Sequence, residues 1–150
     1  NYSITVTDSD IVDNLRVTSH DVLVVYDQVS APAGALATLG ATWASVLDAF
    51  TKGGGVVIVL DGKSGSTHEM NELATQAGLL DVTSHATLAY ASSLTVAAPG
   101  DAVGVGVLSP YGAGNHSATF QLGTGTSSGN IVVRETNGAQ AAVVVHRVVP

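Results

Sequence analysis

The sequence has no cysteine, few charged residues and no long apolar run. Without cysteine, disulfides, thiolate nucleophiles and thiolate metal sites are all excluded. Charged residues make up only 11% of the 150 positions, well below the usual quarter. No apolar stretch approaches the roughly 20 residues that a helix needs to cross a bilayer, so we expect no membrane insertion.

Basic residues are also scarce. Five Lys and Arg stand against twelve Asp and Glu, which gives a formal net charge of −7. Nucleic-acid binding depends on basic side chains that neutralise phosphates, so we expect no nucleic-acid partner, and an anionic membrane surface is disfavoured too. The acidic balance, together with many Ser, Thr and Gly, favours an exported bacterial protein in an extracellular or periplasmic location.

What the chain does contain is a strand–helix–strand–helix pattern between residues 21 and 80. The apolar runs Val22–Tyr26 and Val56–Leu60 read as buried strands. Ser66 and Glu69 form a capping box that opens the second helix, and Gly78 ends it. The first helix carries an apolar stripe at helical spacing: Leu36, Leu39, Trp43, Val46, Leu47 and Phe50. Two strands joined by a helix predict a parallel pair.

The rest of the chain reads mainly as short strands between turns. Tyr2–Thr7 alternates apolar with polar residues and predicts a half-exposed strand, and Asp8 is a suitable N-cap for a brief helix. Asn137-Gly138 predicts a tight hairpin turn. Further strands are expected at Ala86–Tyr90, Leu94–Ala97, Val103–Leu108, Ala118–Leu122, Ile131–Arg134 and Ala141–Val149. The length fits a single domain over residues 1–150.

Three segments carry a resemblance to a known family. They are "HDVLVVYDQ", "FTKGGGVVIVLDG" and the tail "GNIVVRETNGAQAAVVVHRVV". In this order the chain resembles the class I glutamine amidotransferase-like superfamily over about two-thirds of its length. The resemblance implies a three-layer α/β fold with a mainly parallel, flavodoxin-like sheet and additional β-strands and a hairpin in the C-terminal half.

The chain departs from that family in two ways. The catalytic members place a nucleophilic cysteine on a strand-to-helix turn, and this sequence has none, so the glutaminase triad does not carry over. Members also open with a central strand and a helix ahead of the segment that matches Tyr2–Thr7. We therefore expect the usual first strand to be missing. Its absence would leave a strand edge unpaired and would expose apolar side chains to water.

Candidate ligand groups gather where the two parallel strands end. Asp27 and Gln28 follow the first strand, while Asp61 and Lys63 follow the second. The two carboxylates could share a cation such as Mg²⁺ or Ca²⁺, although Asp is also a common turn residue. Lys63 at a helix N-terminus could hold an anion. Tyr111 completes the candidate ligand-binding set, and we expect neither a resident metal nor a cofactor.

The turn at residues 61–66 resembles a nucleophile elbow in its setting, because it follows a strand and opens a helix. On this interpretation Ser64 is the nucleophile and the general base is His116 or His146; His116, in a loop, is the favoured candidate. The alternative is that Ser64 and Ser66 only cap the helix. Single Ser and His residues of this kind serve structural roles more often than catalytic ones, so the alternative is favoured.

Three functional hypotheses follow. The favoured one is a non-catalytic binding or assembly domain, on an amidotransferase-like scaffold without its active centre, whose partner is a protein or a small molecule. The second is a serine-dependent hydrolase that uses Ser64. The third is a subunit that is completed by a strand from a partner chain. A homo-oligomer is also possible.

Overall fold

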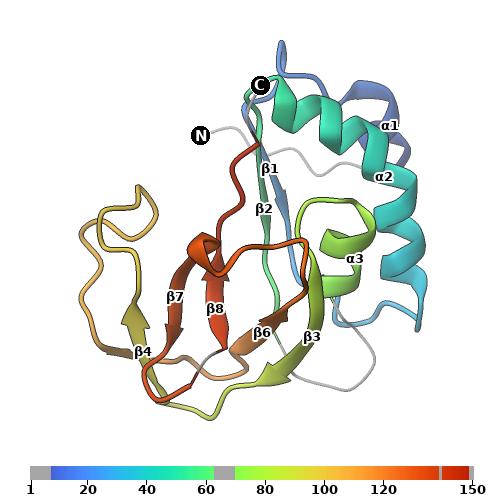
Figure 1. Cartoon of the computed structure of the whole chain (residues 1–150). Coiled ribbons are helices and arrows are strands. Elements are labelled where there is room, and N and C mark those ends of the chain that lie inside the picture. The colour runs from blue at the N-terminus through green and yellow to red at the C-terminus, as the bar shows by residue number, and fades with distance from the viewer. Residues whose placement is uncertain (1–7, 63–69, 139, 149–150) are drawn as a thin grey trace.

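The computed structural model describes residues 8–62, 70–138 and 140–148 of the chain. Figure 1 shows a helix-covered parallel strand pair beside a larger antiparallel sheet. In chain order the elements are α1 (Asp8–Asn14), β1 (Val22–Val25), α2 (Ala35–Lys52), β2 (Val56–Val59), α3 (Met70–Gln76), β3 (Val82–Thr87), β4 (Ser93–Val96), β5 (Tyr111–Gly112), β6 (Ala118–Leu122), the 3₁₀ turn η1 (Ser128–Asn130), β7 (Ile131–Glu135) and β8 (Ala141–Val144).

The predicted parallel pair is confirmed. β1 and β2 run in the same direction, with Val22 opposite Val56 and Val25 opposite Val59. Helix α2 connects the two strands and returns the chain to the end of the sheet at which β1 begins. β2 can therefore run in the same direction as β1. Both strands therefore end at the same edge of the sheet.

The long helix α2 forms where the apolar stripe predicted it. Its buried residues recur about every three or four positions, as a core-facing helix requires: Leu36, Gly40, Trp43, Leu47 and Phe50. The helix ends at Gly53, and Gly55 lets the chain turn into β2. A Cβ atom at Gly55 would overlap the Phe50 ring, so any larger residue there would force this buried ring to move.

The helices α1, α2 and α3 belong to one core with the inward face of the parallel pair. Leu23 and Val25 of β1 point into this core, and α1 and α3 both pack against α2. Figure 1 places the helices on one side of the β1–β2 pair. The buried members of this first cluster are Ile11, Leu15, Leu23, Val25, Leu36, Trp43, Leu47, Phe50, Met70, Leu73 and Ala77.

The second half of the chain forms a six-stranded sheet in the order β3-β6-β8-β7-β4-β5, with antiparallel pairing throughout. β7 and β8 pair as the predicted hairpin, but the connection between them runs from residue 136 to residue 140 and is longer than the tight turn expected at Asn137-Gly138. A second apolar cluster packs on this sheet, and its buried members are Leu88, Leu94, Val96, Ala113, Val132 and Val133. After β8 the chain runs back toward the starting ends of β1 and β2 (Figure 1).

The predicted three-layer, mainly parallel flavodoxin-like sheet is wrong. The described residues form only one parallel pair, and the larger sheet is antiparallel. The reason lies beyond α3, where the strands are joined by turns and loops rather than by helices. Such connections favour antiparallel neighbours, because a parallel neighbour needs a long crossover. β3 accordingly pairs with β6 instead of extending the β1–β2 pair.

Several strand boundaries also differ from the prediction. The strand expected at Ala86–Tyr90 lies earlier, at Val82–Thr87, and the last strand ends at Val144. The strand expected at Val103–Leu108 is a series of turns with exposed side chains, because its alternating valines and glycines find no partner strand. The predicted strand Tyr2–Thr7 and the capping box lie outside the described residues.

Candidate functional site

The carboxyl ends of β1 and β2 bring several predicted residues together. Asp27 follows β1 and Asp61 follows β2, at the same edge of the parallel pair. One Asp27 oxygen, Oδ2, lies 3.1 Å from the position that a Cβ atom on Gly62 would occupy. The other, Oδ1, is buried and has no hydrogen-bond partner among the residues that the structure describes. The Asp27 carboxylate at the end of β1 thus lies close beside Gly62 at the end of β2.

Asp61 makes the most deeply buried polar contact of this edge. Its Oδ2 lies 2.9 Å from Nδ1 of His85, in the middle of β3. The side chains of His85 and Asp61 are 1% and 3% exposed. A proton on Nδ1 lets the imidazole donate to the carboxylate, and such a charge-assisted bond is strong in a buried setting. The pair therefore fastens β3 to the end of β2, joining the parallel pair to the antiparallel sheet.

His85 was not among the predicted site residues. It lies 24 positions after Asp61, in a run of β-branched and small residues, and no motif spacing links the two. The sequence offered no periodic signal for it, because the buried residues Val82, His85 and Leu88 recur at every third position rather than with the two-residue period of a strand. A histidine on the inward face of a strand needs a polar partner, and the acidic strand ends offer one.

His116 reaches the same edge through its backbone. Its carbonyl oxygen lies 3.2 Å from a Cβ position on Gly62, and the next residue, Ser117, forms an isolated antiparallel bridge with Gly62. The His116 side chain is exposed, and its φ of 60° is uncommon for a residue with a side chain. Ser64 and Lys63 lie outside the described residues, so the proposed Ser64–His116 pair stays a prediction.

The two other candidate ligand residues have local roles. Gln28 is exposed, and its side-chain amide donates to the Tyr26 carbonyl oxygen at 2.8 Å, which closes the turn after β1. Tyr111 lies in β5 opposite Leu94 and packs against the second apolar cluster. Neither contact brings a side chain to the Asp27–Asp61 edge.

A shared cation between Asp27 and Asp61 finds little support in this geometry. The Asp61 carboxylate is engaged by His85. Over residues 8–62, 70–138 and 140–148, no group of three or more His, Cys, Asp or Glu side chains is arranged to hold a metal ion. What the geometry does show at this edge is a buried polar contact between two sheets, from Asp61 to His85.

The outward face of the parallel pair is a second candidate site. Six apolar residues alternate along it and are 39–67% exposed: Val22, Val24, Tyr26, Val56, Ile58 and Leu60. We call this surface the open face. It lies opposite the helices, because the intervening residues Leu23 and Val25 point into the first core. No element among the described residues covers these six side chains.

The outer edge of β1 is open as well. Backbone bonds from Val56 to Asp21 and from Leu60 to Val25 show that odd-numbered residues of β1 face β2. The N–H and C=O groups of Val22 and Val24 therefore point away from β2. Within the described part of the chain β1 has β2 as its single hydrogen-bonded neighbour. An exposed apolar face next to an unpaired edge is a combination that folded proteins normally cover.

Comparisons with known proteins add no identity. No family model, no curated protein and no solved structure matches the chain. Among the described residues, none of the helices has the length and apolar character needed to cross a membrane.

Proposed function

We propose that this chain is a non-catalytic binding or assembly domain whose open face is covered by a segment of another polypeptide. The observation that carries the proposal is the row of six exposed apolar side chains on β1 and β2. Parallel strands in folded proteins are normally buried on both faces, and the composition of these two strands, rich in Val, Ile and Leu, is that of a buried sheet. The open β1 edge supports the same proposal.

The size of the open face fits an association surface. The exposed fractions of its six residues add up to nearly three fully exposed residues. This corresponds to roughly 500 Å², at the upper end of the apolar patches found on monomeric proteins, and such patches commonly mark interaction sites. Scattered single apolar residues would need no explanation, but here they form one continuous row on two adjacent strands.

The polar junction at the strand ends supports a structural rather than a catalytic role for this edge. Asp61 and His85 are almost fully buried and bind one another across two sheets. Such a pair holds secondary-structure elements together, whereas a catalytic base must reach a substrate. The scarcity of charge and the abundance of Ser, Thr and Gly favour an exported protein as the setting.

Two matched double variants test the proposal. Val24→Thr with Ile58→Thr makes the open face polar, while Val25→Thr with Val59→Thr makes the same change on the helix-covered face of the same strands. Both pairs keep β-branched side chains. If the open face is uncovered in the free chain, the first variant loses at most about 0.5 kcal/mol of unfolding free energy, as exposed substitutions do.

The second variant, by contrast, places two hydroxyl groups against the first core and should lose about 2–4 kcal/mol. Chemical denaturation followed by circular dichroism measures both. A loss of several kcal/mol in the first variant would mean that the chain already covers this face, and the proposal would fail. Labelling by a fluorophosphonate probe that disappears in Ser64→Ala would establish the hydrolase instead.

A further inference from the structure

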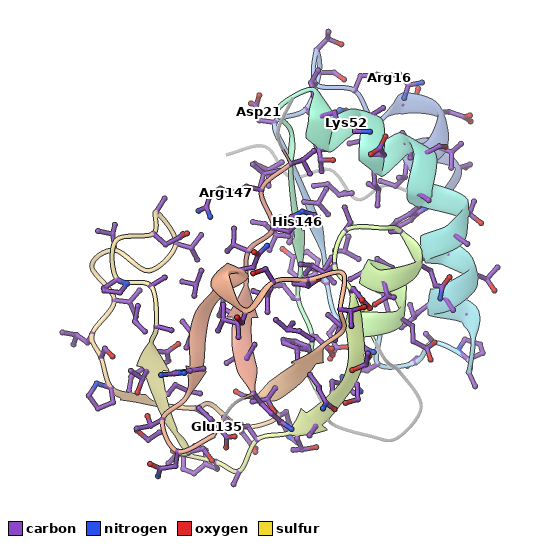
Figure 2. All side chains as sticks on the ribbon, in the orientation of Figure 1. Arg16, Asp21, Lys52, Glu135, His146 and Arg147 are labelled. Carbon is purple, nitrogen blue, oxygen red and sulfur yellow. The ribbon has the colours of Figure 1, made fainter. Side chains whose placement is uncertain are left out.

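The connection between β7 and β8 presents the dipeptide Asn137-Gly138 to solvent. Asn137 is exposed and Gly138 is half-buried. The hydrogen bond from the Glu135 N–H to the Gln140 carbonyl oxygen, 3.2 Å long, closes the paired part of the hairpin. Figure 2 shows Glu135 at the end of this hairpin that points away from α1 and α2. Asn137 therefore lies in a turn beyond the strand pairs, where water reaches its side chain.

The backbone nitrogen that follows Asn137 is unusually accessible. Of the six asparagines in the sequence, Asn137 alone precedes a glycine, which has no side chain to shield its nitrogen. The Gly138 N–H donates to the Glu135 carbonyl oxygen at 3.4 Å. This bond is longer than the roughly 3 Å that is typical of N–H···O hydrogen bonds, so it holds the nitrogen weakly. The nitrogen can therefore turn toward the Asn137 side chain.

We propose that Asn137 deamidates spontaneously, with the backbone nitrogen of Gly138 as the attacking atom. This nitrogen bonds to the side-chain carbon Cγ of Asn137, and the bond from Cγ to the amide nitrogen breaks. The proton of the Gly138 amide leaves with the amino group as ammonia, and a succinimide ring remains. Water then opens the ring. Cleavage at Cγ gives aspartate, whereas cleavage at the backbone carbonyl carbon gives isoaspartate.

The modified turn lies at the centre of the larger sheet. β7 and β8 are the middle strands of the order β3-β6-β8-β7-β4-β5, so their connection joins the two halves of the sheet. Both products add a negative charge two positions from Glu135, in a chain whose formal net charge is already −7. Isoaspartate also inserts one carbon atom into the backbone of the turn. The modification therefore changes both the charge and the length of this connection.

Trypsin isolates the site for mass spectrometry. Cleavage after Arg134 and after Arg147 releases residues 135–147, in which Asn137 is the sole asparagine. After the whole chain is incubated in mildly alkaline buffer, this peptide should contain both aspartate and isoaspartate at position 137. Its conversion should be at least about tenfold faster than that of any other asparagine, because each of those precedes a residue with a side chain.

A synthetic peptide of residues 135–147 tests the part of the inference that depends on the fold. The peptide gives the rate of deamidation without the restraint of the hairpin. Because Asn137 is exposed and the Gly138 hydrogen bond is long, the folded chain should deamidate within about tenfold of the peptide.

Gly138→Ala tests which atom attacks. The new Cβ atom would lie 2.6 Å from Glu135 Oε2, the end of a flexible side chain that can move aside. The added methyl group shields the nitrogen, so conversion of Asn137 should slow at least about tenfold. Gly100→Ala is the control, because its Cβ position has open space around it, and the rate at Asn137 should not change. Circular dichroism checks that both variants fold.

Three results would overturn the inference. An equal rate in Gly138→Ala and in the parent chain would mean that another atom attacks Asn137. Aspartate without isoaspartate would indicate direct hydrolysis by water instead of a ring. A folded chain more than about tenfold slower than the peptide would show that the turn protects Asn137. None of these measurements concerns the open face, so the proposed function would stand in each case.

Discussion

Gly40 offers the sharpest test of the helix packing in the first core. It lies in the buried stripe of α2, where α2 meets α3. A Cβ atom at this position would overlap the Leu73 carbonyl oxygen and would lie 3.0 Å from Leu73 Cα and 3.1 Å from Gln76 Cβ. Two of these three atoms belong to the backbone, so they cannot move aside without shifting α3 as a whole.

Two opposite effects determine what Gly40→Ala does. Replacing glycine with alanine inside a helix normally adds about 0.5–1 kcal/mol of stability, because glycine loses more backbone entropy on folding. Overfilling a packed contact costs about 1–3 kcal/mol. Because the overlap involves backbone, we expect the packing cost to dominate and the unfolding free energy to fall by about 1–2 kcal/mol.

Urea denaturation followed by circular dichroism measures this change. The adjacent position provides the control: Ala41 is exposed on the same helix, so Ala41→Gly reports helix propensity alone and should cost about 1 kcal/mol. If Gly40→Ala instead raised the unfolding free energy, the gain in helix propensity would not be offset by a packing cost. That result would refute the close approach of α2 and α3 at Leu73.

Two further predictions concern polar contacts. Asp61→Ala removes the buried carboxylate that binds His85 and should lower the unfolding free energy by about 2–4 kcal/mol in denaturant titrations; a change below about 0.5 kcal/mol, the size of an ordinary surface effect, would contradict the junction. The Asp101 pKa lies below its usual 3.8, first because the Val103 backbone N–H donates to the carboxylate and then because Arg147 pairs with it. The ionised Asp101 carboxylate therefore contributes its full share of folding stability above pH 3.8, and this contribution disappears as the pH falls through the lowered pKa. In carboxyl-detected NMR, Arg147→Gln should raise the Asp101 pKa only in part, because the Val103 bond remains. A full return to 3.8 would show that the Val103 bond does not lower the pKa.

Part of the fold could be predicted because its signals are local. The stripe of α2 and the two apolar runs each specify an element by their own period, and the helix between the runs permits a parallel pair. The position of Asp27 and Asp61 at one edge followed from that pair. The resemblance to amidotransferase-like proteins and the exported location stay predictions.

The partners of the strands could not be predicted in the same way. Whether β3 joins β2 or β6 depends on contacts between distant segments, and neither period nor turn residues specify it. The missed His85 has the same cause, because its link to Asp61 exists only once β3 lies against the end of β2.

The sequence by itself determined that Val22–Tyr26 and Val56–Leu60 are strands of buried character that lie in parallel beside α2. Only the tertiary structure decided which of their faces is covered. The helices fill one side, and the later described strands form their own antiparallel sheet, so within the described part of the chain the second face is exposed although its residues are as apolar as a core. The physical reason is that hydrophobic patterning shows which side chains favour burial, whereas burial itself depends on which other segments pack against them.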